Sequence, residues 1–273
     1  MTNTFNALLI FFFFFAAMNL AAAQPQSKSD SCPRDDKDFA AIQQRADAND
    51  SVAQTALASC YDLGMHVQAD GKESIRWLTK AANQGYAPAE YELGRIYLYG
   101  RGIEADYAKA LLWERKAAEQ GDPRAQRDLA FMYERGFGVA TDPAQAAAWN
   151  RKAAMQGQPA AQLELARKLA RVPDCAQAKH WYKEASAVGE PAAMYELGML
   201  YLNAKCGVDR NEAFIWLTLG GRHGSEESKT ESAQLGRGLP PAQKKHDLLI
   251  VEQWIKTHPN VGKGENEEEE EER

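Results

Sequence analysis

The sequence predicts an all-α protein, built as a solenoid of about five tandem helical hairpins with capping helices at its ends. Two observations lead to this fold class: a motif that recurs about every 36 residues, and an apolar spacing within each copy that matches a helix. The composition agrees, because 45% hydrophobic and 26% charged residues are typical of a folded globular protein.

The first helix of each copy begins near an alanine, and these alanines recur at spacings of 36, 36, 36 and 32 residues. They are Ala53, Ala89, Ala125, Ala161 and Ala193. Four residues later each copy has a leucine and then a small residue, and the eighth position is tyrosine in every copy except the fourth. Positions 0, 4, 5 and 8 lie on one face of an α-helix, so we expect this face to be buried.

The second helix of each copy is marked by an aspartate seven residues before a tryptophan and by a glycine eight residues after it. The aspartates are Asp70, Asp106, Asp142, Asp174 and Asp209, the tryptophans Trp77, Trp113, Trp149, Trp181 and Trp216, and the glycines Gly85, Gly121, Gly157, Gly189 and Gly224. We expect the aspartates to be N-caps, with Glu or Gln three residues on completing capping boxes in four copies, and the glycines to be C-caps. Since the tryptophans coincide with regularly spaced alanine and leucine, we interpret them as core residues.

These spacings set the expected domain boundaries. The repeats span 53–88, 89–124, 125–160, 161–192 and 193–225. Residues 24–52 form an N-terminal segment with a capping helix, 226–262 form closing helices, and 263–273 form a disordered acidic tail. The last nine residues supply the whole net charge of −6, so the body before them is formally neutral.

The N-terminal residues decide the expected compartment. An unbroken apolar run over 7–17, followed by Ala21-Ala22-Ala23, predicts a signal peptide over 1–23 and export to the periplasm or beyond. The segment before this run has no Lys or Arg, so an uncleaved membrane anchor is the alternative. After cleavage we expect no membrane insertion, because no second apolar run of spanning length follows.

An oxidising compartment favours disulfides for the four cysteines. Antiparallel stacking of the helices brings the start of one helix beside the end of its neighbour, which favours the pairs Cys32–Cys60 and Cys175–Cys206. The other two connectivities, and a buried free thiol at Cys60, are the alternatives.

The run A-x3-L-[GA]-x2-Y, then G-x-G, then D-x6-W-x2-K-A-A-x3-G, which covers Ala53 to Gly224, resembles the Sel-one-like repeat family of the tetratricopeptide-like superfamily. The fourth copy departs from the pattern, with Val172-Pro173-Asp174 in place of the glycine loop, and so does the fifth, with Gly220-Gly221 in place of the alanine pair. The resemblance implies a right-handed α/α superhelix and an adaptor or scaffold role, in bacteria often in an exported protein of the cell envelope. A narrower version is an immunity protein that neutralises a toxic effector in the periplasm.

Some exported relatives of this family are described as penicillin-binding or β-lactam-hydrolysing, but the sequence offers no nucleophile motif for that chemistry. It contains no G-x-S-x-G, S-x-x-K, H-E-x-x-H or C-x-x-C pattern. We therefore expect no catalytic residue, no metal site and no cofactor. The neutral body without a basic run argues against a nucleic-acid partner. We expect a monomer; self-association through the end helices would instead indicate a mechanical part of an envelope machine.

Positions 2, 6 and 10 of each first helix point away from the buried face, toward a predicted concave surface. The residues predicted to bind a partner there are Tyr91, Arg95, Tyr99, Arg127, Phe131, Arg135, Arg167, Arg171 and Tyr195. Arginine and aromatic residues are enriched at interface hot spots, and the arginines make this groove locally positive. The expected partner is therefore another protein or an extended peptide, of acidic character.

The alternative interpretation pairs the groove arginines with carboxylates of the same chain. The candidates are Glu92, Asp128, Glu164 and Glu196.

Overall fold

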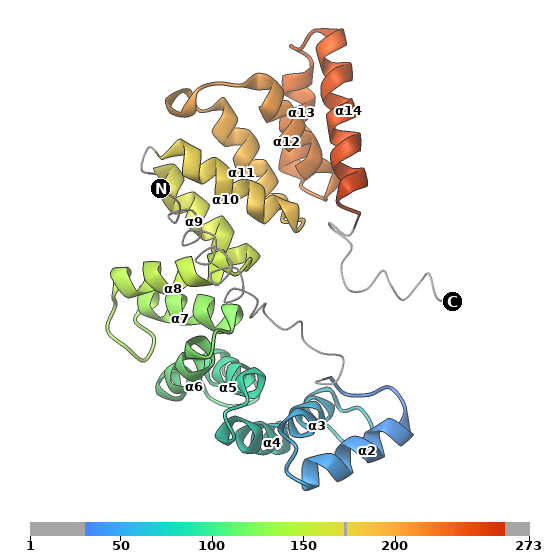
Figure 1. Ribbon diagram of the computed structural model, residues 1–273, viewed down its shortest axis with the longest axis vertical. Coiled ribbons are helices and arrows are strands. Elements are labelled where there is room, and N and C mark those ends of the chain that lie inside the picture. Colours follow the sequence, from blue (N-terminus) through green and yellow to red (C-terminus); the bar gives the residue numbers. More distant parts are fainter. Residues whose placement is uncertain (1–30, 172–173, 260–273) are drawn as a thin grey trace, which may run out of the picture. The chain divides into compact units, whose positions relative to one another are not determined.

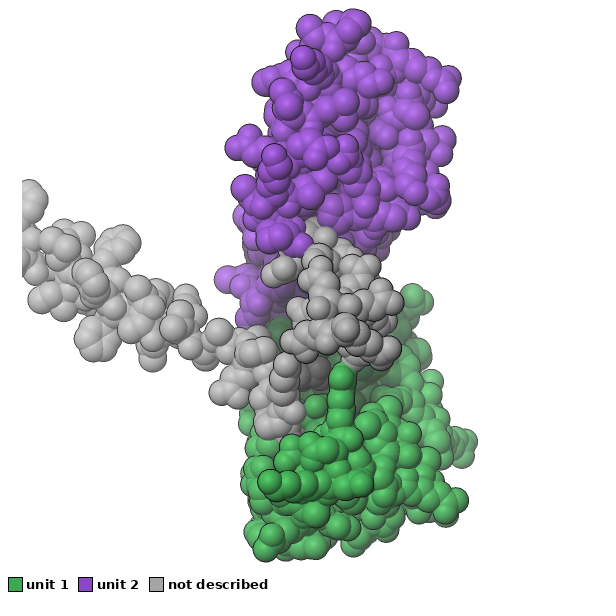
Figure 2. Space-filling view, turned by 90° about the vertical axis from the view of Figure 1, so that its right-hand side faces the viewer, with its two compact units in different colours: residues 1–149 green, residues 150–273 purple. Residues whose placement is uncertain are grey.

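The computed structural model describes residues 31–171 and 174–259, and within these ranges the regular secondary structure is entirely helical (Figure 1). The predicted signal peptide over 1–23 and the acidic tail over 263–273 lie outside the described residues. The chain divides into two compact units, Met1–Trp149 (unit 1) and Asn150–Arg273 (unit 2), which Figure 2 shows in different colours.

The helices follow the predicted alternation of first and second helices. Unit 1 contains α2 (Asp36–Asp47), α3 (Ser51–Leu63), α4 (Gly71–Asn83), α5 (Ala87–Tyr99), α6 (Tyr107–Glu119) and α7 (Pro123–Arg135). The division between the units falls within α8 (Pro143–Met155). Unit 2 continues with α9 (Pro159–Arg171), α10 (Cys175–Ala187), α11 (Pro191–Leu202), the 3-10 turn η1 (Ala204–Cys206), α12 (Arg210–Arg222), α13 (Glu226–Gly236) and α14 (Pro241–Thr257).

The predicted aspartate N-caps are confirmed, but the capping boxes are not. The Asp70 side chain accepts hydrogen bonds from the backbone N–H groups of Lys72 and Glu73. The backbone N–H of Asp70 itself donates to the carbonyl of Tyr61 at 3.0 Å, and Asp106, Asp142 and Asp209 make the same bond to Tyr97, Tyr133 and Tyr201. A carbonyl at the end of the first helix thus takes the donor that a capping box would satisfy, which ties the two helices of a hairpin together.

The glycines expected as C-caps lie one residue beyond the cap. In α6 the cap is Gln120, and Gly121 follows it with a φ of +100°. A left-handed residue just after the cap is a common way to end a helix, and glycine adopts it without steric cost.

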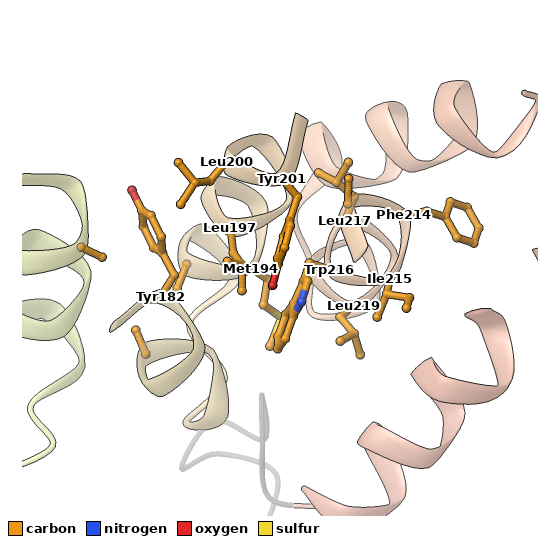
Figure 3. Packing of buried hydrophobic residues seen from close by; sticks show 14 of the residues in the cluster. Tyr182, Met194, Leu197, Leu200, Tyr201, Phe214, Ile215, Trp216, Leu217 and Leu219 are labelled. Atoms are coloured by element: carbon orange, nitrogen blue, oxygen red, sulfur yellow. The ribbon is translucent and has the colours of Figure 1, made fainter. Parts of the chain in front are cut away.

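The alanines, leucines and tryptophans of the motif pack together as predicted. In unit 1 one cluster contains Trp77 and Trp113 with Leu57, Leu93 and the alanine pair of α4. In unit 2 the largest cluster joins Met194 and Leu197 of α11 to Trp216 and Leu217 of α12 (Figure 3). Trp254 of α14 packs edge-on against Trp216, with ring centroids 6.3 Å apart, so the closing helices cover the last repeat.

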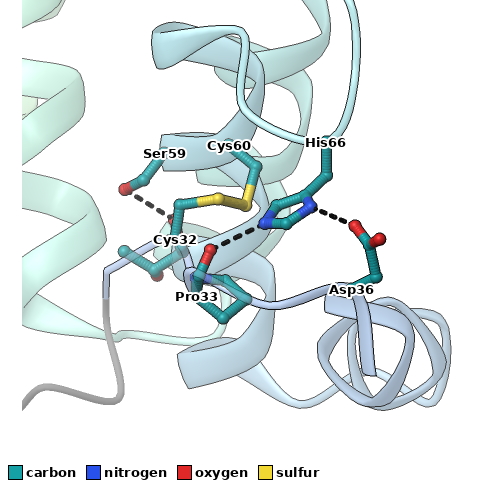
Figure 4. Close-up of a disulfide and its surroundings, with 7 residues drawn as sticks. Cys32, Pro33, Asp36, Ser59, Cys60 and His66 are labelled. Carbon is teal, nitrogen blue, oxygen red and sulfur yellow. Dashed lines mark hydrogen bonds and ion pairs between the residues drawn. A yellow bond between two sulfur atoms is a disulfide. The ribbon is translucent and has the colours of Figure 1, made fainter. Parts of the chain in front are cut away.

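Both predicted disulfides are present. Cys32–Cys60 has its Cα atoms 4.9 Å apart and joins the segment before α2 to α3 (Figure 4). Cys175–Cys206 has its Cα atoms 5.4 Å apart and joins the start of α10 to η1. The alternative of a free thiol at Cys60 is therefore wrong.

His66 is held at both of its ring nitrogens. Its Nδ1 lies 2.8 Å from Oδ1 of Asp36 and its Nε2 lies 2.8 Å from the carbonyl oxygen of Pro33 (Figure 4). Its ring stacks on that of Phe39. Because both partners are acceptors, the doubly protonated ring satisfies both at once, and the Pro33 carbonyl and Asp36 raise the pKa of His66. In this form the imidazole fastens the N-terminal segment beside the first disulfide.

We expect this fastening to weaken as pH rises. A histidine whose pKa is higher in the folded than in the unfolded state stabilises fully below its unfolded pKa of about 6.5, and loses that effect as pH rises through its folded pKa. Amide hydrogen exchange in α2 should therefore speed up from pH 6 to about pH 8, relative to the exchange of amides in helices that do not contact α2. The variant His66→Gln should lose this dependence, whereas His180→Gln, at an exposed position of α10, should retain it. Identical pH profiles for His66→Gln and the parent chain would contradict the assignment.

Candidate functional site

Three repeat-equivalent positions meet where one hairpin packs on the next. With the starting alanine of each first helix counted as position 0, they are position 6 of a first helix, the residue after the tryptophan in the same copy, and position 3 of the first helix in the next copy. We call each set an inter-repeat triad. Within unit 1 the triads are Ser59, Leu78 and Glu92 (copies 1 and 2) and Arg95, Glu114 and Asp128 (copies 2 and 3). Within unit 2 the triad of copies 4 and 5 is Arg167, Tyr182 and Glu196.

The triad of copies 4 and 5 is closed by its own hydrogen bonds. Arg167 Nε lies 2.9 Å from Oε1 and 3.1 Å from Oε2 of Glu196, and the hydroxyl of Tyr182 donates to Oε2 at 2.9 Å. Burial and this bond to Glu196 raise the pKa of Tyr182, and the bond to Glu196 raises the pKa of Arg167. Arg167, which the sequence placed in the partner-binding groove, is thus held by a carboxylate of its own chain, as the alternative interpretation expected.

In the triad of copies 2 and 3 the arginine and the carboxylate are arranged differently. The neighbouring Arg127 forms the ion pair with Asp128. The guanidinium carbon of Arg95 instead lies 5.7 Å from the ring centroids of both Tyr91 and Tyr99. Among the described residues, no carboxylate oxygen lies within 4.0 Å of Arg95. Arg95 is therefore a cation between two aromatic rings, with hydrogen-bonding capacity left for a ligand.

The two tyrosines beside Arg95 differ in exposure. Tyr99 is 52% exposed, as a partner-binding residue requires. Tyr91 is only 5% exposed and belongs to a core cluster with Ala117, Ala118, Ala125 and Leu129, so the expectation that it lies open on the surface is wrong. The Arg124 guanidinium covers its ring at 4.2 Å. Burial first, and then the charge of Asp128, raises the pKa of Tyr91 to about 12.

Glu114 is the member of this triad that sequence reasoning missed. It is fully buried, and neither carboxyl oxygen has a hydrogen-bond partner among the described residues. Its carboxyl group packs against Gly94, where a Cβ atom would lie 2.7 Å from Oε1. Burial, followed by the charge of Asp128, raises the pKa of Glu114 well above its ordinary value. Burial likewise raises the pKa of Asp128, against the opposing effects of Arg127 and Arg95.

The sequence contained a signal for Glu114. The residue after each tryptophan is Leu78, Glu114, Asn150, Tyr182 and Leu217, and each of them is buried. Asn150 and Tyr182 have hydrogen-bond partners and the leucines need none. An acid at a position that leucine occupies in two other copies marks a site that packing alone does not explain.

The remaining predicted residues are dispersed between the two units. In unit 1, Arg135 is exposed and lies 5.6 Å over the ring of the half-buried Phe131. In unit 2, Arg171 is exposed, whereas Tyr195 packs against the core cluster of that unit. Arg95, Tyr99, Arg127, Phe131 and Arg135 therefore remain as the candidate surface of unit 1, formed by α5 and α7.

In the ranges 31–171 and 174–259, no group of three or more His, Cys, Asp or Glu side chains is placed to hold a metal ion. None of the described helices is both long enough and apolar enough to cross a membrane.

The repeated hairpins, their capped second helices and the inter-repeat triads define a helical repeat protein. The Sel1 repeat model matches five times, over residues 51–86, 87–122, 123–158, 159–189 and 191–225, and the chain therefore belongs to the Sel1 repeat family. Sel1 repeats mediate protein–protein interactions and are typically non-catalytic.

Solved structures show the same fold. A Sel1 repeat protein from Oxalobacter formigenes is 31% identical, with 74% of this chain and 60% of that chain covered and a TM-score of 0.66. The protective antigen c5321 of uropathogenic Escherichia coli, which displays an SLR fold, is 26% identical, with 82% and 57% covered and a TM-score of 0.64. The chain thus spans about three fifths of the length of these two proteins.

Immunity protein Pa5087 from Pseudomonas aeruginosa is 21% identical, with 87% and 91% covered, but its TM-score of 0.44 is too low to bear on function. Comparison with curated proteins gives no match.

We expect Glu114→Leu to stabilise the protein. A buried polar group without a partner costs about 1–3 kcal/mol, and leucine already occupies the equivalent position in two copies, so the free energy of unfolding should rise by about that amount. Urea denaturation followed by circular dichroism measures it. The control Glu119→Leu changes an exposed glutamate of the same helix and should stay within about 0.5 kcal/mol.

The sign of the pH dependence provides a second measurement on the same variant. Folding raises the pKa values of Glu114 and Asp128. Their contribution to the free energy of unfolding is therefore most favourable below the unfolded carboxyl pKa of about 4, and it is lost as pH rises toward the folded pKa values. In Glu114→Leu the free energy of unfolding should therefore fall less steeply as pH rises. A lower stability of Glu114→Leu at neutral pH would show that the carboxyl has a partner after all.

Proposed function

We propose that this protein is a non-catalytic interaction scaffold of the bacterial cell envelope, exported by the signal-like segment 1–23 and acting in the periplasm. Its membership of the Sel1 repeat family supports the scaffold role, since such repeats generally mediate protein–protein contacts. The two disulfides support export, because such bonds persist in oxidising compartments.

The partner is a protein or an extended peptide segment of acidic character, and it binds the candidate surface formed by α5 and α7. One observation carries this choice: Arg95 lies between tyrosine rings, without a carboxylate within 4.0 Å, beside a Tyr99 that is half exposed. Glu92 and Asp128 act on Arg95 only from beyond 4.0 Å, so a partner that covers the guanidinium has to supply an acceptor for its remaining donors. A rigid exposed ring next to it adds apolar contact area, as is typical of interface hot spots.

The double variant Arg95→Glu with Arg135→Glu should reduce capture of the partner at least tenfold, because it reverses two charges on this surface. Arg167 is unsuitable for this purpose, since it holds Glu196 and its loss would disturb the stack itself. The measurement is in-cell cross-linking of the tagged full chain, followed by quantitative mass spectrometry of the captured proteins.

The matched control reverses two exposed lysines outside α5 and α7, Lys37→Glu with Lys72→Glu, and should leave capture unchanged. Circular dichroism must show the same helical signal for all variants. Equal capture by the parent chain and by the arginine double variant would remove α5 and α7 as the binding surface.

A further inference from the structure

The triad of copies 1 and 2 opens into a pocket. All three members, Ser59, Leu78 and Glu92, line a cavity of about 90 Å³ that lies wholly within unit 1. One water molecule needs only about 10–15 Å³ on this measure, so the pocket holds a group of several non-hydrogen atoms.

The pocket exists because two side chains of this triad are smaller than their equivalents in copies 4 and 5. Ser59 stands where copy 4 has Arg167, and Leu78 stands where copy 4 has Tyr182. In unit 2 those two long side chains fill the space next to Glu196 and hydrogen-bond its carboxylate. In unit 1 the shorter Ser59 and the apolar Leu78 leave the equivalent space empty of protein atoms and provide no such bond to Glu92.

Glu92 accordingly keeps an unused carboxylate. Among the described residues it makes no hydrogen bond, and its one ion pair is a long one, from Arg101 Nη1 at 4.0 Å. By contrast Glu196, at the same position of copy 5, accepts from two side chains. The Glu92 carboxylate is thus an acceptor that lacks the guanidinium donor which Arg167 supplies to Glu196.

Two arginines also line this pocket, and each has a carboxylate of its own. Arg124 Nη2 lies 2.8 Å from Oδ2 of Asp122, and Arg101 Nη2 lies 2.8 Å from Oδ2 of Asp62. The charges that line the pocket balance, with Asp62 and Glu92 against Arg101 and Arg124. What favours a cation is that Glu92, unlike the other three, has no ion-pair partner closer than 4.0 Å.

We propose that the pocket of copies 1 and 2 binds an arginine side chain of the partner, whose guanidinium pairs with Glu92 as that of Arg167 pairs with Glu196. A planar guanidinium suits this site, because it can donate two hydrogen bonds to one carboxylate while its stem contacts Leu78. This inference rests on the proposed scaffold function and refines the partner: a segment that carries an arginine for this pocket as well as acidic residues for the surface of Arg95.

The pocket can be tested without the partner. Nα-acetyl-arginine amide is titrated into the ¹⁵N-labelled mature chain, and the amide signals of Ser59, Glu92 and Ile96 are followed by NMR. Nα-acetyl-norleucine amide and Nα-acetyl-glutamate amide serve as the apolar and the acidic probe. We expect saturable shifts with the arginine probe alone, with a Kd on the order of 1 mM.

Two variants test the geometry. Glu92→Gln removes the charge that pairs with the guanidinium and should weaken binding of the arginine probe about tenfold, whereas Glu119→Gln at an exposed position of α6 should not change it. Ser59→Arg places a side chain like that of Arg167 in the pocket and should abolish binding. Gln68→Arg adds the same charge at an exposed site of unit 1 and should leave binding intact.

The outcomes decide between the interpretations. No saturable shift with the arginine probe, equal shifts with the norleucine or glutamate probe, or unchanged binding to Glu92→Gln would each overturn the proposal. If Ser59→Arg fails to fold, Glu92→Gln with its control still decides. Since these titrations need no partner, their result is independent of whether Arg95→Glu with Arg135→Glu loses capture in cells.

Discussion

The structure depends on close approach between the two helices of a hairpin and on cover from the next hairpin. A Cβ atom at Gly198 would lie 2.6 Å from Leu217, and one at Gly94 would meet Glu114 at a similar distance, so the small residue at position 5 lets α11 lie against α12 and α5 against α6. The apolar faces so formed are completed only by the neighbouring pair. Each repeat is therefore stable through its neighbours, and the motif residues have little freedom to serve any other purpose.

The inter-repeat triads show where the freedom remains. The same three positions hold a closed arginine–tyrosine–glutamate set in unit 2, an arginine between rings above a buried acid in copies 2 and 3, and an open pocket in copies 1 and 2. The backbone frame is common to all, because the alanine, leucine and tryptophan positions around them do not change. In a repeat of this kind the motif residues provide the packing and the triad residues are free to bind ligands. Substitutions at a few triad positions can therefore change which ligand is bound without changing the fold.

Much of this arrangement follows from the sequence, since helical period, aspartate caps, closing helices and cysteine pairing depend on local spacing. The predictions from sequence that were wrong concern residues whose burial or hydrogen bonding depends on a neighbouring helix. Tyr91 is buried because Ala117 and Ala118 leave room for its ring and Arg124 covers it. The capping boxes of copies 1, 3 and 5 are absent because a carbonyl of the preceding helix takes the backbone donor of the capping aspartate. Glu114 stands out only when the residues after the tryptophans are compared between copies, and the pocket only when position 6 of one copy is considered together with position 3 of the next.

The disulfides are placed unequally along the chain, and this affects how the stack comes apart. Tandem repeats lose structure first at their termini, where a hairpin has one neighbour instead of two. Cys32–Cys60 holds the first capping helix covalently against α3, whereas α13 and α14 are held only by non-covalent packing such as that of Trp254 on Trp216. We therefore expect α13 and α14 to lose their order before α2, so that the copies that carry the arginine surface and the pocket remain folded longer than the C-terminal helices.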